Sequence, residues 1–135
     1  MNDLFVDTSV WSLAYRRDSP STSPEVAALR AALVAGAEVF TCGMVLLELL
    51  RGFVPASAQR RIVSDLGSVE LLEPARGDYI AAAELANQCR RAGVQITSVD
   101  ALIAHLAIHH GLTLLSTDRD FEHAARVVPL RLWGY

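Results

Sequence analysis

The sequence predicts an α/β fold with a mainly parallel sheet. Short apolar runs of strand-like composition alternate along the chain with longer segments whose apolar residues recur at helical spacing. The 135 residues, 52% of them hydrophobic, are enough for one well-buried core. Because no internal repeat, low-complexity tract or long linker divides the chain, we expect a single domain over residues 1–135.

The first elements are defined by apolar runs and by their end signals. Leu4–Val6 has the composition of a short buried strand, and Asp7 follows it directly. Apolar residues at helical spacing then predict a helix over 8–17. After the polar loop RRDSPSTSP, Ser23 as a cap begins a second helix, which Gly36 ends.

The remaining elements continue the alternation. A strand at 39–41 leads into a very apolar helix at 42–51, which Gly52 ends. We then expect, in order, a helix at 55–66, a strand at 69–72, helices at 78–92 and 98–111, a strand at 112–116, a short helix at 121–125 and a last strand at 127–132.

Composition excludes several classes of protein. Glu48 interrupts the most apolar stretch, so no run approaches the roughly 20 residues that span a bilayer, and no secretory leader is visible. We therefore expect a cytoplasmic protein without a membrane partner. Cys42 and Cys89 are too few and too far apart for a disulfide framework or a thiolate zinc site.

The net charge of −3 is unfavourable for a nucleic-acid partner, but all twelve basic residues are arginines, which suit phosphate contacts. The absence of lysine argues against aspartyl phosphatases, receiver domains and P-loop proteins, each of which uses a lysine at the phosphate. A nucleophile elbow, G-x-S-x-G, is also absent.

Acidic residues recur where the predicted strands end. Asp7 ends the first strand, Asp118 follows the strand LTLLS, and Asp100 lies in the first turn of a helix. Ligand sites of parallel α/β sheets lie beyond the carboxyl ends of the strands, and Glu48 adds a fourth acid from a neighbouring helix.

Taken singly, each acid has a structural explanation. Asp7 would cap a helix, Asp100 would complement the helix dipole and Asp118 would organise a turn. A carboxylate in the apolar segment MVLLELL needs a partner, and Arg51, three residues further on, is the nearest candidate for an ion pair with Glu48.

Taken together, the four acids predict a metal site. Carboxylates brought close to one another repel and raise their proton affinities, so a positive charge must compensate them. Oxygen-only ligands suit Mg²⁺, with Mn²⁺ as the second choice, and such an ion activates water and neutralises charge at a phosphodiester. The predicted chemistry is phosphodiester hydrolysis.

Four fragments occur in the order FVDTSVW, LLELLRG, SVDALIAHLA and LLSTDRDF, and their order and spacing extend over almost the whole chain. In these four fragments the sequence resembles the PIN-domain ribonucleases, and among them the VapC toxins of toxin–antitoxin pairs. The resemblance implies a three-layer α/β/α sandwich, metal-dependent endoribonuclease activity on RNA, a cognate antitoxin and a homodimer. It also implies catalytic and metal-binding roles for Asp7, Glu48, Asp100 and Asp118, with Asp7 and Asp100 as the strongest metal ligands.

Several nearby residues admit two interpretations. Ser9, Ser116 and Thr117 would either orient ligands or form turns and caps. Asp120 is well explained by the start of the short helix and stays outside the predicted site. His105 and His109 stand four residues apart, but without an H-E-x-x-H motif we interpret them as a packed or solvent-facing pair rather than a zinc site.

The alternative function belongs to another class. A catalytically weak PIN-like protein would act mainly as a protein-interaction or RNA-binding module. The helices around 26–34 and 45–54 carry enough hydrophobic residues to form a partner groove, although core packing explains most of them.

Overall fold

The sheet is parallel throughout, as the sequence predicts. The structure, a computed structural model, describes residues 3–16, 23–52 and 55–134. Its four strands pair in the order β3-β2-β1-β4, and every pairing is parallel. The strands are β1 (Leu4–Val6), β2 (Val39–Cys42), β3 (Glu70–Leu72) and β4 (Thr113–Leu115).

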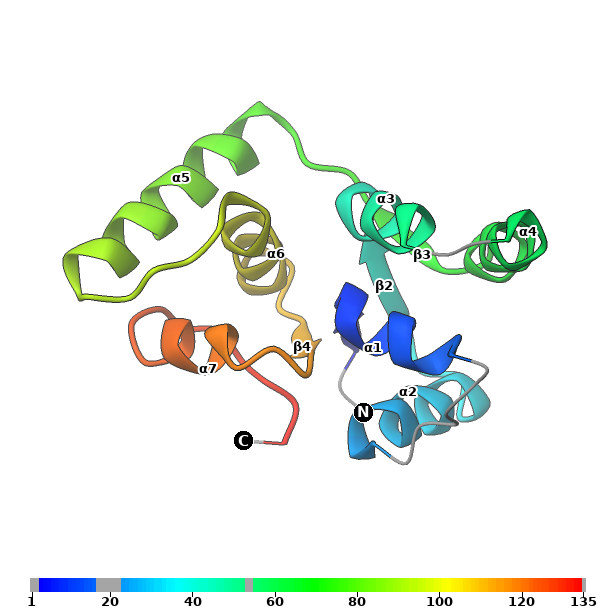
Figure 1. The fold of residues 1–135 in the computed structure, drawn as a ribbon. Coiled ribbons are helices and arrows are strands. Elements are labelled where there is room, and N and C mark those ends of the chain that lie inside the picture. Colours follow the sequence, from blue (N-terminus) through cyan, green and yellow to red (C-terminus); the bar gives the residue numbers. More distant parts are fainter. Residues whose placement is uncertain (1–2, 17–22, 53–54, 135) are drawn as a thin grey trace.

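Helices surround this sheet (Figure 1). Within the described residues they are α1 (Thr8–Ala14), α2 (Pro24–Val34), α3 (Gly43–Arg51), α4 (Ala56–Leu66), α5 (Arg76–Arg91), α6 (Ser98–His109) and α7 (Asp120–Ala125). Each predicted helix is present, with its ends displaced by a few residues at most. The predicted polar loop and the end of the first predicted helix fall partly on residues 17–22, outside the described ranges.

The predicted last strand at 127–132 is wrong. Only Leu132 forms a bridge, to Leu114 of β4. The preceding residues form a turn, in which the N–H of Leu130 donates to the carbonyl of Val128 at 2.8 Å. Pro129 also lacks the N–H that a ladder requires, so the apolar composition of this segment does not produce a strand.

The strand register decides which loops meet. Val6 stands opposite Leu115, and the N–H of Asp7 donates to the carbonyl of Leu115 at 3.0 Å. The chain moves from β1 to β2 and β3 on one side and returns to β4 on the other, so the strand order reverses between β1 and β4. A crevice for a ligand is expected at the carboxyl ends of such a strand pair.

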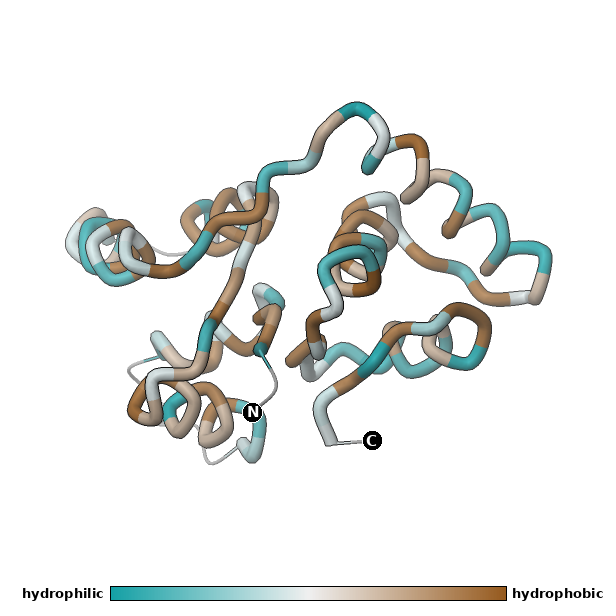
Figure 2. The backbone as a smooth tube through the Cα atoms, turned by 180° about the vertical axis from the view of Figure 1, so that it is seen from behind, coloured by the Kyte–Doolittle hydropathy of each residue, from teal (hydrophilic) through white to brown (hydrophobic). Residues whose placement is uncertain are grey.

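The core lies between the sheet and its helices. Phe5 of β1 and Leu114 and Leu115 of β4 are fully buried, as is Ile103 of α6. The hydropathy-coloured tube in Figure 2 shows apolar segments along the strands and along α6. Burial of this helix explains why its sequence is apolar on nearly every face.

A conservative truncation tests this packing. Ile103→Val removes one methyl group from a fully buried side chain and is expected to lower the free energy of unfolding by about 0.5–1.5 kcal/mol. Ile80→Val is the matched control, because Ile80 is 56% exposed and its change should stay within about 0.5 kcal/mol. Urea titrations measure both, and equal losses would contradict the assigned core.

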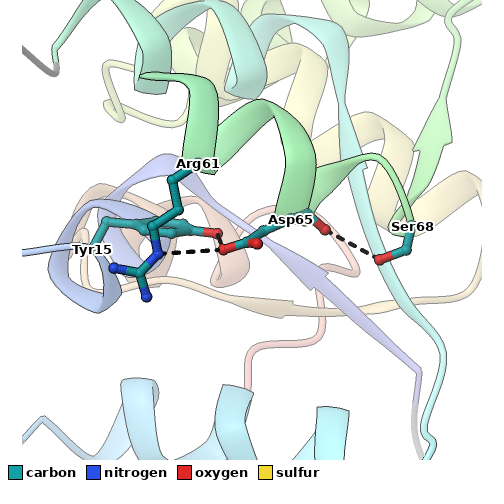
Figure 3. A network of polar contacts seen from close by, with 4 residues as sticks. All are labelled: Tyr15, Arg61, Asp65 and Ser68. Carbon is teal, nitrogen blue, oxygen red and sulfur yellow. Dashed lines mark hydrogen bonds and ion pairs between the residues drawn. The ribbon is translucent and has the colours of Figure 1, made fainter. Parts of the chain in front are cut away.

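A network of polar contacts connects α4 to the end of α1 (Figure 3). The hydroxyl of Tyr15 donates to Asp65 Oδ2 at 2.9 Å, and Arg61 lies 3.8 Å from the same oxygen. Burial and the hydrogen bond to Asp65 raise the pKa of Tyr15. Ser68 donates to the backbone carbonyl of Asp65 at 3.1 Å and so closes the end of the helix.

None of the helices in the described ranges combines the length and the apolar character needed to cross a membrane.

Candidate active site

Asp7 occupies the N-cap position of α1, but its carboxylate does not cap the helix. The hydroxyls of Ser9 and Ser116 both donate to its Oδ2, at 3.0 and 2.8 Å. No hydrogen bond from a described residue reaches Oδ1. Asp7 as a residue is only 6% exposed, and the two serine hydroxyls hold its carboxylate in one orientation with Oδ1 left for a ligand.

Ser116 links the carboxyl ends of the neighbouring strands β1 and β4. Besides donating to Asp7, its Oγ accepts the backbone N–H of Asp118 at 3.0 Å and lies 3.3 Å from Ser9 Oγ. Ser9 Oγ in turn accepts the N–H of Thr117 at 3.1 Å. Both serines therefore orient the site, whereas Thr117 contributes its backbone.

Glu48 projects from α3 toward the same edge of the sheet. Its Oε1 accepts a hydrogen bond from Thr8 Oγ1 at 2.9 Å. Among the described residues it forms no ion pair with Arg51, the candidate that the alternative structural explanation offered. Arg51 is exposed to solvent, and Thr8 is the hydrogen-bond partner of Glu48 instead.

Asp100 and Asp118 come from the start of α6 and from the loop after β4. The N–H of Asp100 donates to Thr97 Oγ1 at 3.1 Å, which caps α6. Asp118 Oδ1 accepts the N–H of Asp120 at 2.9 Å, which is the turn role that the sequence suggested. Carboxylate oxygens of Asp100, Asp118 and Asp120 lie within 4.8 Å of one another.

The charges of the site act on one another. Burial raises the pKa of Asp100 to about 6, and the negative charges of Asp7, Asp118 and Glu48 add to the shift. Burial also raises the pKa of the Cys42 thiol, again with contributions from Asp7 and Glu48. Within the described part of the chain, no arginine forms an ion pair with any of the four acids.

The structure thus brings carboxylate oxygens of Asp100 and Asp118 within 4.8 Å of each other, whereas Asp7 and Glu48 are not part of this group and act on Asp100 through their charges. Asp120 lies outside the predicted site, but its carboxylate joins those of Asp100 and Asp118, and Thr8, the partner of Glu48, was not predicted either. The spacing D-x-D in STDRDF is a usable signal for Asp120. No local signal identifies Thr8, because its partner is 40 residues away.

The orienting role of Ser116 gives a testable expectation. Ser116→Ala removes the donor to Asp7 and the acceptor for the Asp118 N–H, and we expect a loss of roughly 10- to 100-fold in activity, the range for groups that orient a site. Thr117→Ala is the control, because only its backbone takes part. The rates at which both variants hydrolyse phosphodiester bonds check this expectation. Equal rates for Ser116→Ala and Thr117→Ala would contradict it.

The described fold and site define an α/β domain with an acidic site at the carboxyl edge of a parallel sheet. The PIN domain family matches residues 4–127. Ribonuclease VapC11 of Mycobacterium tuberculosis and a VapC ribonuclease of Mycobacterium bovis are each 31% identical over 132 residues, covering 95% of this chain and 96% of the relative. The chain therefore belongs to the PIN domain family, and its curated relatives are VapC ribonucleases.

Solved structures show the same fold. The VapBC2 complex of Rickettsia felis, bound to a promoter DNA fragment, has a TM-score of 0.77 at 20% identity and covers 96% of both chains. VapC20 of Mycobacterium tuberculosis, a toxin that cleaves the sarcin–ricin loop, has a TM-score of 0.68 at 21% identity, covering 95% of this chain and 98% of its own. The predicted fold class and family resemblance are confirmed.

Proposed function

We propose that this protein is an Mg²⁺-dependent endoribonuclease, with Mn²⁺ as a substitute, and that it is the toxin of a toxin–antitoxin pair. Its family and its ribonuclease relatives support the activity. The observation that carries the metal requirement is the group of acids around Asp100, which has no arginine partner within the described residues.

The residues present fit a hard divalent ion. Burial among other carboxylates raises the pKa of Asp100, and a cation would remove this repulsion. Among the described residues the group around Asp100 offers carboxylate oxygens and no imidazole, and Cys42 is a buried thiol whose pKa is raised, which makes it a poor ligand. This donor set suits Mg²⁺ and Mn²⁺ better than Zn²⁺.

Each acid receives a distinct role. Asp7 and Asp100 would be direct ligands, because no hydrogen bond from a described residue reaches Asp7 Oδ1 and burial beside other carboxylates raises the pKa of Asp100. Glu48, held by Thr8, would bind the ion through water or position the nucleophilic water. Asp118 would complete the site, and Asp120 lies close enough to assist it.

When bound, the ion supplies positive charge to the phosphodiester oxygens and lowers the pKa of water. The protein holds the carboxylates in place through Ser9, Ser116 and Thr8. Water as the nucleophile in an in-line attack leaves a 3′-hydroxyl and a 5′-phosphate. The RNA 2′-hydroxyl takes no part in this reaction.

Product analysis tests this function. Structured RNAs incubated with the protein and Mg²⁺ or Mn²⁺ should be cut to 3′-hydroxyl and 5′-phosphate ends, and excess chelator should stop the reaction. Cleavage that persists in chelator, or yields 2′,3′-cyclic phosphates, would contradict the metal mechanism. Tight RNA or protein binding without metal-dependent cleavage would instead favour the interaction module.

The partners follow as part of the same proposal. A cognate antitoxin would block the acidic site, and the toxin would form a homodimer. Exposed large apolar side chains on α2, α3 and α5 support protein contacts, among them Val34, Leu47 and Ile80. Co-expression with a small protein encoded next to this chain should abolish RNA cleavage and give a complex that survives gel filtration.

A further inference from the structure

A second group of metal-ligating side chains lies between α5 and α6. Asp78 is in the first turn of α5, and His105 and His109 lie in the second half of α6. One ligand atom from each of the three lies within 4.8 Å of the other two. The acidic site meets α6 at Asp100 in its first turn, so the two groups lie toward opposite ends of this 12-residue helix.

The carboxylate of Asp78 is fixed before any ion binds. Its Oδ2 accepts the backbone N–H of Ala75 at 2.8 Å, and its Oδ1 is 2.8 Å from His105 Nε2. The bond from Ala75, with a further contribution from His105, lowers the pKa of Asp78, so this ligand is already charged. Little reorganisation is needed to present an anionic oxygen.

The two imidazoles lie one helical turn apart on the same face. The rings of His105 and His109 are stacked, with centroids 5.5 Å apart and an angle of 22° between their planes. The His105 and Asp78 side chains are 14% and 17% exposed, whereas His109 is exposed to solvent. An ion can therefore reach the group from the side of His109.

We propose that Asp78, His105 and His109 form a transition-metal site, with Zn²⁺ as the ion that fits best. Two imidazoles and one carboxylate are a donor set typical of protein zinc sites, and water would occupy the fourth tetrahedral position. Imidazole ligands also suit Ni²⁺ and Cu²⁺, whereas Mg²⁺ prefers oxygen alone. The site differs in chemistry from the acidic edge of the sheet.

Binding requires one small rearrangement. Because Asp78 is charged, His105 Nε2–H donates to Asp78 Oδ1 at 2.8 Å, whereas two ligands of one tetrahedral Zn²⁺ would stand roughly 3.4 Å apart. To bind the ion, the His105 imidazole would exchange protons with water so that Nδ1 carries the hydrogen and Nε2 presents its lone pair. The two ligand atoms would then separate by a few tenths of an ångström. The exposed His109 side chain has the freedom to complete the coordination.

A bound Zn²⁺ would cross-link helices α5 and α6. Asp78 comes from α5 and the histidines from α6, so the complete ligand set exists only in the folded chain. An ion that binds the folded state alone shifts unfolding to higher temperature. Zn²⁺ should therefore raise the melting temperature independently of RNA cleavage.

Calorimetric titration and NMR on the full chain test the site. Zn²⁺ should shift the imidazole signals of His105 and His109 in the wild type but leave those of His123, an exposed residue of α7, unchanged. His109→Gln and Asp78→Asn should each weaken this Zn²⁺ binding step at least about tenfold. His123→Gln is the matched control and should bind as the wild type does.

Zn²⁺ could also bind at the acidic site, and Asp7→Asn distinguishes the two binding events. This variant should lose Zn²⁺ binding at the acidic site and keep the binding that depends on His105 and His109. Wild-type imidazole signals that stay unshifted in excess Zn²⁺ would overturn the proposal. So would equal Zn²⁺ affinities in the wild type and His109→Gln. The NMR measurement needs no variant, so misfolding of Asp78→Asn would leave the test intact.

Discussion

Replacing Asp7 by asparagine is expected to lower the rate of RNA cleavage by about a thousandfold or more. Asp7 as a residue is 6% exposed, and Ser9 and Ser116 hold its carboxylate through Oδ2, so asparagine fits the space but loses the charge. Electrostatic stabilisation by a bound ion is worth several kcal/mol, and about 4 kcal/mol corresponds to three powers of ten in rate. Initial rates on a cleavable RNA with Mg²⁺ measure the loss.

The control for Asp7→Asn is Glu84→Gln, which removes one negative charge from an exposed position of α5. It should cleave RNA at the wild-type rate. Circular dichroism should show the same helix content in all three proteins. Wild-type cleavage by a folded Asp7→Asn variant would remove the central ligand from the proposed mechanism.

The second large effect is the pH dependence that Asp100 imposes. Its pKa is raised to about 6, so at limiting Mg²⁺ a proton competes with the ion below that pH. Cleavage should fall by up to tenfold per pH unit on the acidic side. Because the competition is for one site, raising the Mg²⁺ concentration should move this acidic limb to lower pH. A limb that does not move would contradict the assignment.

The same shift affects the stability of the metal-free protein. The folded state holds the Asp100 proton more tightly than the unfolded state, whose pKa stays near 3.8. Stability therefore falls as the pH rises from about 4 to about 6 and stays lowered above that range.

Asp100→Asn removes this dependence. In chelator above pH 6 it should be more stable than the wild type, on the order of 1 kcal/mol once solvent screening of the partly exposed group is allowed for. Urea titrations at several pH values measure the difference. Mg²⁺ should then stabilise the wild type more than the variant, and identical pH profiles would refute the argument.

Much of the fold could be predicted from local patterns. The apolar run Leu4–Val6, the cap at Ser23 and the stops at Gly36 and Gly52 act within a few residues, so these elements could be located from the sequence. The strand predicted at 127–132 was wrong for an equally local reason. Apolar composition suits a strand there, but Pro129 and the local turn prevent a ladder.

The position of the acids was also predictable, because a parallel sheet brings the carboxyl ends of its strands to one edge. Side-chain partners were not. The sequence suggested Arg51 for Glu48, but the structure pairs Glu48 with Thr8. His105 and His109 are visible as a helical pair, whereas Asp78 joins them only because α5 packs against α6.

The sequence by itself determined the order of strands and helices and which acids follow the strands, because hydrophobic periodicity, capping and turn chemistry are local. Only the tertiary structure decided that Ser116 orients Asp7, that Thr8 holds Glu48 and that Asp78 meets the histidines. These contacts join segments 27 to 109 residues apart, and their geometry depends on strand register and helix packing.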